Sequence, residues 1–262
     1  MMGYQEHTQE KIFLYNIYLE TRVRKGHPLR RIRELVDLDF IYKEVKDKYG
    51  KNGNVSVPPP VILKLMFLLF FYNVRSEREL METIPERIDW LWFLGYTLDS
   101  SVPDHSVLSK ARARWGKEVF KQFFERIVVQ CVEKGLVDGT KIFMDASLID
   151  ANASNNSVID TQSLNKYLNK AYQELEERLE EKDQDGVGAT HISLTDPDAS
   201  IVRHKGGKPK LQYKTHRAVD SLHEVITAVE VTTGSVNEAH KMASLIDDHT
   251  ANTLTRPDTV AP

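Results

Sequence analysis

The hydrophobic pattern of this chain changes its period near Thr140, and this change limits the possible folds more than any other feature. From residue 29 to residue 135, apolar residues recur every three or four positions, which is the spacing of buried helix faces. After Thr140 the apolar residues alternate with polar ones, and β-branched residues are common, as in strands. We therefore predict an α+β protein with a helical part followed by a part that contains a sheet.

Proline, glycine and helix-capping residues divide the first part of the chain into short helices. Pro58-Pro59-Pro60 should begin a helix that continues through Val61–Tyr72. Ser76 and Glu79 form an S-x-x-E capping box at the start of the next helix, and Pro85 should stop or kink it. A third short helix, Ile88–Leu94, contains Trp90, Trp92 and Phe93 as expected core residues and should end at Gly95.

A short basic helix is predicted after an Asp104 N-cap. It covers Leu108–Trp115 and carries Lys110, Arg112 and Arg114, which we expect on one side. Short helices with tight turns, one of them basic, are typical of a helix-turn-helix-like DNA-binding module. The alternative is a helical bundle whose Arg and Lys side chains are simply solvated.

The second part is expected to contain three strands and two helices. Strands are predicted at 142–149, 211–219 and 225–232, and the last two should form an antiparallel hairpin that ends at Gly234. A helix at Glu238–Asp247 should follow, with Ala239, Met242, Leu245 and Ile246 facing inward. Between the first strand and the hairpin, a stripe of apolar residues predicts an inserted helix, with members Leu164, Leu168, Tyr172, Leu175 and Leu179.

Asp145 is a single carboxylate within the apolar first strand. Burying an ionised carboxylate beside Phe143 and Met144 is costly unless a positive group or a metal ion compensates the charge. Asp145 should therefore belong to a metal site or lie at a solvated strand end.

Composition places the chain among soluble globular proteins. It has 262 residues, 41% of them hydrophobic and 28% charged, with a net charge of −3, so the whole chain is not a polycation. Positive charge nevertheless gathers near the N-terminus and between Arg203 and Arg217, while an acidic block at 174–185 offsets it. The one cysteine, Cys131, lies in an apolar run and predicts a buried thiol in a reducing compartment.

No export signal or membrane span is expected. The N-terminus has no apolar signal core, and the apolar stretch Val61–Tyr72 contains Lys64 and is shorter than the roughly 20 residues of a bilayer span. These features predict a cytoplasmic protein without a membrane partner.

Several sequence blocks resemble one family. The segment Phe143–Ala153 resembles the strand of the first aspartate in bacterial insertion-sequence transposases of the DDE type, and the blocks 195–199, 210–220 and 232–238 look like those that follow it. The helical half is similar to the InsH-type N-terminal domain, on the segments 28–32, 57–78, 92–96 and 103–106. The resemblance covers roughly residues 28 to 260.

The resemblance implies a particular domain organisation. It predicts an N-terminal tail at 1–27, a helical DNA-binding-like domain at 28–136, and an RNase H-like catalytic domain at 137–262 with an insertion at about 154–200. That second domain would be incomplete, with a first strand, a helical insertion, a β-hairpin and a helix.

The family's chemistry requires three carboxylates around two magnesium or manganese ions, which activate the attacking oxygen and stabilise the leaving 3′-oxygen. By resemblance, Asp145 is the catalytic and metal-binding acid. The expected partners are DNA, namely terminal inverted repeats and target DNA, and a further copy or an intact transposase at the nucleoid. Contacts with DNA phosphates are predicted for Lys110, Arg112 and Arg114 of the basic helix and for a second group, Lys205, Lys208, Lys210, Lys214 and Arg217. The alternative for the second group is an exposed basic loop.

The family's second aspartate should lie on a strand that begins at about Thr259, shortly beyond Pro262, and its glutamate still later. Other acids are poor substitutes: Asp150 should face the opposite side of the strand from Asp145, and Asp220 belongs to a turn. We therefore expect a truncated transposase that is inactive alone. The alternatives are a DNA-binding regulator or dominant inhibitor of the intact transposase, and a remnant that never folds stably because its sheet edge and last helix are uncovered.

Overall fold

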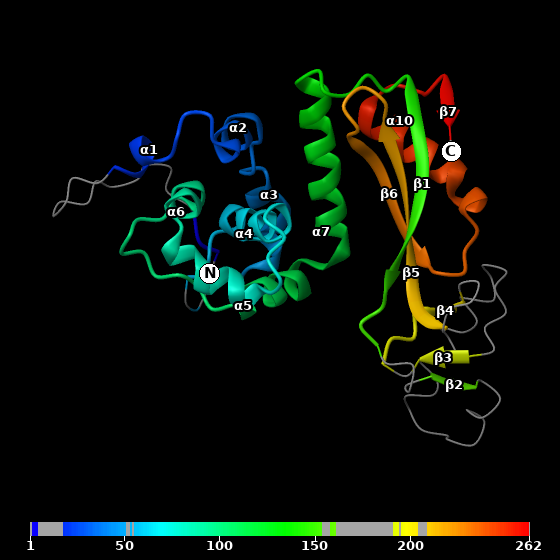
Figure 1. Cartoon of the computed structure of the whole chain (residues 1–262), viewed down its shortest axis with the longest axis horizontal. Coiled ribbons are helices and arrows are strands. Elements are labelled where there is room, and N and C mark those ends of the chain that lie inside the picture. Colours follow the sequence, from blue (N-terminus) through cyan, green and yellow to red (C-terminus); the bar gives the residue numbers. More distant parts are fainter. Residues whose placement is uncertain are drawn as a thin grey trace. The chain divides into compact units, whose positions relative to one another are not determined.

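A computed structural model describes residues 2–4, 18–50, 53, 55–153, 158–160, 191–193, 195–203 and 209–261 (Figure 1). The chain divides into two compact units, Met1–Gln130 and Cys131–Pro262. The first is helical and the second contains a mixed sheet with helices, so the prediction of an α+β protein is confirmed. The predicted helical stripe at 164–179 and the acidic block lie outside the described residues.

Helices make up the first unit, and most of them are short. They are α1 (Leu19–Arg22), α2 (Pro28–Leu35), α3 (Ile41–Val45), the 3-10 turn η1 (Lys46–Lys48), α4 (Pro59–Phe71), α5 (Glu77–Thr83), the 3-10 turn η2 (Ile84–Glu86), α6 (Ile88–Leu94) and α7 (Ser106–Glu133). The figure shows α7 as the long green helix after α6.

Several of these helix ends lie where the sequence predicted them. The Ser76 hydroxyl accepts a hydrogen bond from the Glu79 amide at 3.1 Å and caps α5. Pro85 falls in η2, directly after α5 ends, and Gly95 terminates α6 in the left-handed conformation at φ 81°. Asp104 accepts a hydrogen bond from the Ser106 amide at 2.8 Å and so caps α7.

Helix α7 is longer than the predicted 108–115 segment. Gly116, at φ 74° and ψ 171°, breaks it, so a first segment ends at Trp115 and a second continues to Glu133. The helical spacing up to residue 135 anticipated helix in the second segment too, although only the first segment was given bounds.

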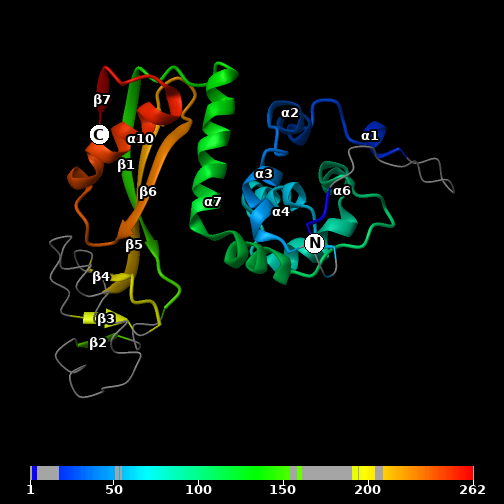
Figure 2. The same ribbon diagram turned by 180° about the vertical axis from the view of Figure 1, so that it is seen from behind.

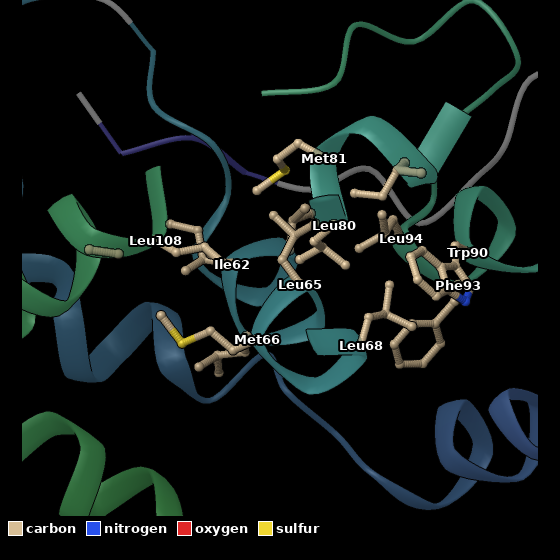
Figure 3. Packing of buried hydrophobic residues seen from close by; sticks show 14 of the residues in the cluster. Ile62, Leu65, Met66, Leu68, Leu80, Met81, Trp90, Phe93, Leu94 and Leu108 are labelled. Atoms are coloured by element: carbon tan, nitrogen blue, oxygen red, sulfur yellow. The ribbon is translucent and has the colours of Figure 1, made fainter. Parts of the chain in front are cut away.

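The core of this unit gathers apolar side chains from most of its helices (Figure 3). Leu65 and Leu68 of α4 and Leu80 of α5 are fully buried. Trp90, Trp92 and Phe93 of α6 are 2% exposed, which confirms that they are core residues. Burial of these large side chains supplies the main stabilisation of the unit, since apolar surface removed from water contributes about 25 cal/mol per Å².

The second unit is built on β1 (Lys141–Asp150), β4 (Ser200–Val202), β5 (Lys210–Asp220), β6 (Ile226–Thr233), and β7 (Thr259–Ala261), with a separate pair, β2 (Val158–Asp160) and β3 (His191–Ser193). Strands β5 and β6 form the predicted antiparallel hairpin, and β5 also pairs antiparallel with β1. On its other edge β1 pairs with β7 in parallel, so a strand does begin at Thr259 as predicted.

One face of this sheet is covered by the helix α10 (Met242–Thr253), which follows the 3-10 turn η4 (Glu238–Lys241). Figures 1 and 2 both show α10 against the sheet. Leu245 packs with Ile142, Ala218 and Ala228 in a small core. The prediction that the apolar face of this helix is uncovered is therefore wrong. The prediction of an uncovered sheet edge differs, because β6 pairs with β5 alone among the described strands.

The prediction of one helix at 238–247 is wrong in its bounds. The α-helix starts at Met242 and continues to Thr253, and Ala239 and Met242, expected inside, are exposed. The inward stripe is instead Leu245, His249 and Thr253 at a spacing of four. Two of these three residues are polar, which is why apolar periodicity placed the helix too early.

No helix in the described part of the chain combines the length and the apolar character needed to cross a membrane.

Candidate functional site

Asp145 lies in the middle of β1, and its side chain is 70% exposed. The predicted solvated strand end is wrong in its position, because the residue lies inside the strand, but the side chain is solvated as that alternative required. Successive side chains of a strand point to opposite faces, so Met144 packs toward the α10 side while Asp145 points to the other. This second face also carries the exposed apolar residues Phe143, Ile149, Val229 and Val231, and we call it the open face.

Arg217 balances the charge of Asp145. The two residues are directly opposite each other in the β1–β5 ladder, and the Arg217 Nη2 lies 3.1 Å from the Asp145 Oδ2. The same nitrogen donates a hydrogen bond to the Ser147 hydroxyl, one pleat along β1. A cross-strand guanidinium thus performs the compensating role that the sequence assigned to a metal ion or base.

A two-metal site requires several acids close together, and the described residues do not provide them. No group of three or more His, Cys, Asp or Glu side chains in the described ranges could hold a metal ion. Asp150 is on the opposite face of β1, as its spacing predicted, and binds Lys210 at 2.8 Å and Gln212 at 2.6 Å. Asp145 with Arg217 therefore does not fit the magnesium-binding set of the DDE family.

Asp220 has a structural role, as its position in a turn suggested. It is completely buried, and its carboxylate accepts hydrogen bonds from the amides of Gly139 at 2.8 Å and Leu222 at 2.9 Å. These bonds join the start of β1 to the hairpin turn.

A buried histidine that the sequence did not single out lies close by. His249 of α10 contacts the Thr227 hydroxyl through Nδ1 at 2.6 Å and the Gly139 carbonyl through Nε2 at 3.0 Å. It therefore joins α10 to β6 and to the entry of β1. The only signal in the sequence was a polar residue four positions after Leu245.

Three described cations of the basic run, Lys210, Lys214 and Arg217, lie on β5 and do not share one surface. Lys210 pairs with Asp150, Lys214 donates to the Val236 carbonyl at 2.9 Å and lies 3.7 Å from Glu238, and Arg217 pairs with Asp145. Lys214 and Arg217 are three residues apart and therefore project from opposite faces of β5. Lys205 and Lys208 lie outside the described residues.

A groove in the helical unit brings two of the predicted DNA-binding residues together. Lys110 and Arg114, one helical turn apart on α7, line a cavity of about 640 Å³ with Val55, Val57 and Pro103. The Arg114 guanidinium is also 4.7 Å from the centre of the Tyr49 ring. We call this cavity the α7 groove.

Arg112 does not belong to the α7 groove. It forms an ion pair with Glu77 of α5. The prediction that all three cations share one side of the helix is therefore wrong, because a spacing of two residues turns a side chain about 200° around the axis.

Two other residues of interest have structural surroundings. His105 lies 3.2 Å from Asp104 and 3.3 Å from the Arg78 guanidinium, at the start of α7. Cys131 is half-buried, and burial raises the pKa of its thiol, which makes it less reactive.

Comparison with known proteins concerns the helical part. Residues 17–114 match a family model described as a transposase domain (DUF772). The searches of curated proteins and of solved structures gave no match. The matched region includes α1 to α6 and the Lys110 and Arg114 positions of the α7 groove, so this part of the chain is similar to a transposase domain.

Proposed function

We propose that this chain is a transposase-type protein of a bacterial insertion sequence, and that its helical unit binds the DNA of element ends. The match of residues 17–114 to a transposase domain carries the proposal. The α7 groove gives it a location, since Lys110 and Arg114 can approach two phosphates from adjacent helical turns.

The groove has two properties that suit a nucleic-acid backbone. Its cations are exposed at the rim, where they can exchange water and counterions for phosphate oxygens. Its apolar wall, formed by Val55, Val57 and Pro103, can contact sugar or base surfaces.

Fluorescence anisotropy with labelled duplexes tests this assignment. One duplex carries the terminal inverted repeat that flanks the gene, and another of equal length carries a scrambled sequence. The Lys110→Ala/Arg114→Ala variant should bind the repeat at least tenfold more weakly, because it loses two phosphate contacts.

A matched variant on the same helix, Lys117→Ala/Lys121→Ala, removes equal charge outside the groove and should bind as the wild type does. Equal affinity of the wild type for the repeat and the scrambled duplex would contradict recognition of element ends.

The second unit supports a relation to DDE transposases through its topology. Strands β6, β5 and β1 are neighbours and antiparallel, and after α10 the strand β7 pairs in parallel with β1. The first strand, the hairpin and the helix follow one another along the chain as the resemblance to an RNase H-like domain implies. We assign no cleavage step to the described residues, because Arg217 balances Asp145 and no group of three or more acids, histidines or cysteines among them could hold a metal ion. Magnesium-dependent chemistry would require further carboxylates.

A nicking assay with supercoiled DNA in Mg²⁺ or Mn²⁺ checks this part of the proposal. We expect no nicking by the protein alone. Nicking that disappears in Asp145→Asn would show that the chain does assemble an active metal site.

The Asp145–Arg217 pair favours a second candidate function, that of a DNA-binding regulator. A protein that binds element ends without cutting them would compete with an intact transposase. Addition of this protein to a transposition reaction of the intact enzyme should then reduce strand transfer, and the Lys110→Ala/Arg114→Ala variant should reduce it less.

A further inference from the structure

The segment from Tyr18 to Leu35 has a charge opposite in sign to that of the whole chain. It contains six Arg and Lys residues against two Glu residues, while the complete chain has a net charge of −3. The segment forms α1, α2 and the turn between them. Its cations fall into two classes, which the structure separates by their contacts.

The first class consists of Arg30 and Arg33, which are used inside the unit. Both guanidinium groups lie over the Trp92 ring, at 4.8 and 4.7 Å from its centre. Both also pair with Glu20, which in turn accepts a hydrogen bond from the Trp92 indole at 2.6 Å. Burial opposes ionisation of Glu20, but hydrogen bonds from Arg30 and Trp92 lower the pKa of Glu20 and keep it charged.

Arg30 also holds the backbone of the turn. It donates hydrogen bonds to the carbonyls of Glu20, Val23 and Arg24, and the Val23 side chain is buried in the core. Arg30 of α2 therefore holds the backbone of α1 at Glu20 and the backbone of the turn at Val23 and Arg24. A backbone fixed in this way loses little conformational freedom when it binds a ligand.

The second class consists of the four remaining cations, Arg22, Arg24, Lys25 and Arg31, which we call the α1–α2 cationic surface. All four side chains are exposed. Within the described ranges none of these four cations forms a salt bridge. The acid Asp89 is already paired with Arg87 and His27. The acid Glu20 is paired with Arg30 and Arg33. Among the described residues, two of the six cations therefore share the carboxylate of Glu20, and the other four are exposed without an ion pair.

We propose that the α1–α2 cationic surface binds the phosphate backbone of duplex DNA, as a second contact apart from the α7 groove. The chain as a whole is acidic, so general attraction to a polyanion cannot supply this binding, and an excess of cations on one anchored turn can. Such contacts position a duplex without reading its sequence. The inference rests on the proposed DNA-binding function and deepens it.

The salt dependence of binding measures this contact directly. Each phosphate that a cation neutralises contributes about 0.9 to the slope of log K against log salt concentration for duplex DNA. Arg22→Ala/Arg24→Ala/Lys25→Ala should therefore flatten the slope by about 2 to 3, on the scrambled duplex as well as on the repeat. The variant should keep the wild-type melting temperature, because these side chains are exposed.

A matched control removes the same charge from another part of the helical unit. Lys43, Lys46 and Lys48 are also exposed, but Glu44 and Asp47 lie among them in the sequence. The slope for Lys43→Ala/Lys46→Ala/Lys48→Ala should remain within about 0.5 of the wild-type value, because no phosphate contact is lost.

The outcomes separate the two proposals. An unchanged slope in the triple variant of the surface overturns the inference, and end recognition through the α7 groove can still hold. A flattened slope together with equal affinity for repeat and scrambled DNA supports the phosphate contact and overturns end recognition. Absence of any duplex binding at 50 mM salt overturns both.

Discussion

At the scale of single residues, burial decides how a charged group behaves. Lys64 lies on the otherwise apolar helix α4, with its ammonium 5.8 Å from the centre of the Phe93 ring. Burial, and secondly the charge of Arg33, lower the pKa of Lys64 to about 8. The sequence showed only one lysine in an apolar run; the tertiary structure shows that its charge opposes folding.

Lys64→Met should stabilise the helical unit at pH 7. The folded state binds the proton less tightly than the unfolded state, whose lysine pKa is about 10.4, so wild-type stability should rise between pH 8 and 10. The stability of the Lys64→Met variant should not rise between pH 8 and 10. At pH 7 its free energy of unfolding should exceed that of the wild type by about 1–3 kcal/mol, since one pKa unit corresponds to ~1.4 kcal/mol.

Urea titrations at pH 7 and 9.5, followed by tryptophan fluorescence, measure this effect, because all three tryptophans lie in the helical unit. Lys43→Met, at an exposed position, is the control. An identical pH dependence in wild type and Lys64→Met would contradict the assignment.

Asp145 and Asp220 provide a second comparison between residues of one type. Asp220 is buried, and its carboxylate accepts hydrogen bonds from two backbone amides. In Asp220→Asn the side-chain NH2 group would face one of these amide donors, so the free energy of unfolding should fall by about 1–3 kcal/mol. Asp145 is 70% exposed, so Asp145→Asn should change stability by less than about 0.5 kcal/mol. Urea unfolding followed by circular dichroism in the strand region compares them, and equal losses would refute the contrast.

At the scale of elements, the ends of the helices follow local sequence rules. Ser76, Pro85 and Gly95 occupy the positions at which they were expected to begin or stop a helix, because caps depend on near neighbours alone. Helix α10 departs from the rule of apolar spacing. Its buried His249 is satisfied by Thr227 and Gly139, which are distant in sequence, whereas the hydroxyl of the buried Thr253 donates to the His249 carbonyl one turn earlier.

Gly95→Ala should destabilise the helical unit by about 1 kcal/mol, because φ is 81° at this position and a side chain there is strained. Gly26→Ala is the matched control, since a methyl group at Gly26 meets no atom within 4 Å. Thermal unfolding monitored by tryptophan fluorescence should show a lower melting temperature for Gly95→Ala only. A similar change in both variants would indicate a general effect of losing a glycine.

At the scale of the whole molecule, the two units have cores of very different size. The helical core extends over α1 to α7, whereas the sheet core contains Ile142, Ala218, Ala228 and Leu245. The open face of the sheet adds nothing to that core, since Phe143 and Val231 remain exposed. Among its described residues, the core of the sheet unit therefore consists of few side chains.

Leu245→Ala should remove much of the stability of the sheet unit. A large-to-small change in a buried site costs about 2–5 kcal/mol, and Leu245 is the largest contribution of α10 to this core. Circular dichroism at increasing urea concentrations should show the sheet signal lost earlier than in the wild type. Val231→Ala, on the open face, should leave that midpoint nearly unchanged, and a loss as large as that of Leu245→Ala would contradict this division of faces.

The sequence by itself determined the α+β class, the helix ends at Ser76, Pro85 and Gly95, and the position of Asp145 on a strand, because these depend on periodicity and on near neighbours. Only the tertiary structure decided which charges meet. It placed Arg217 beside Asp145, Glu77 beside Arg112 and Glu238 beside Lys214, and it left Arg22, Arg24, Lys25 and Arg31 exposed. Pairing between distant residues follows from strand register and helix packing, and the local pattern of one chain does not contain that information.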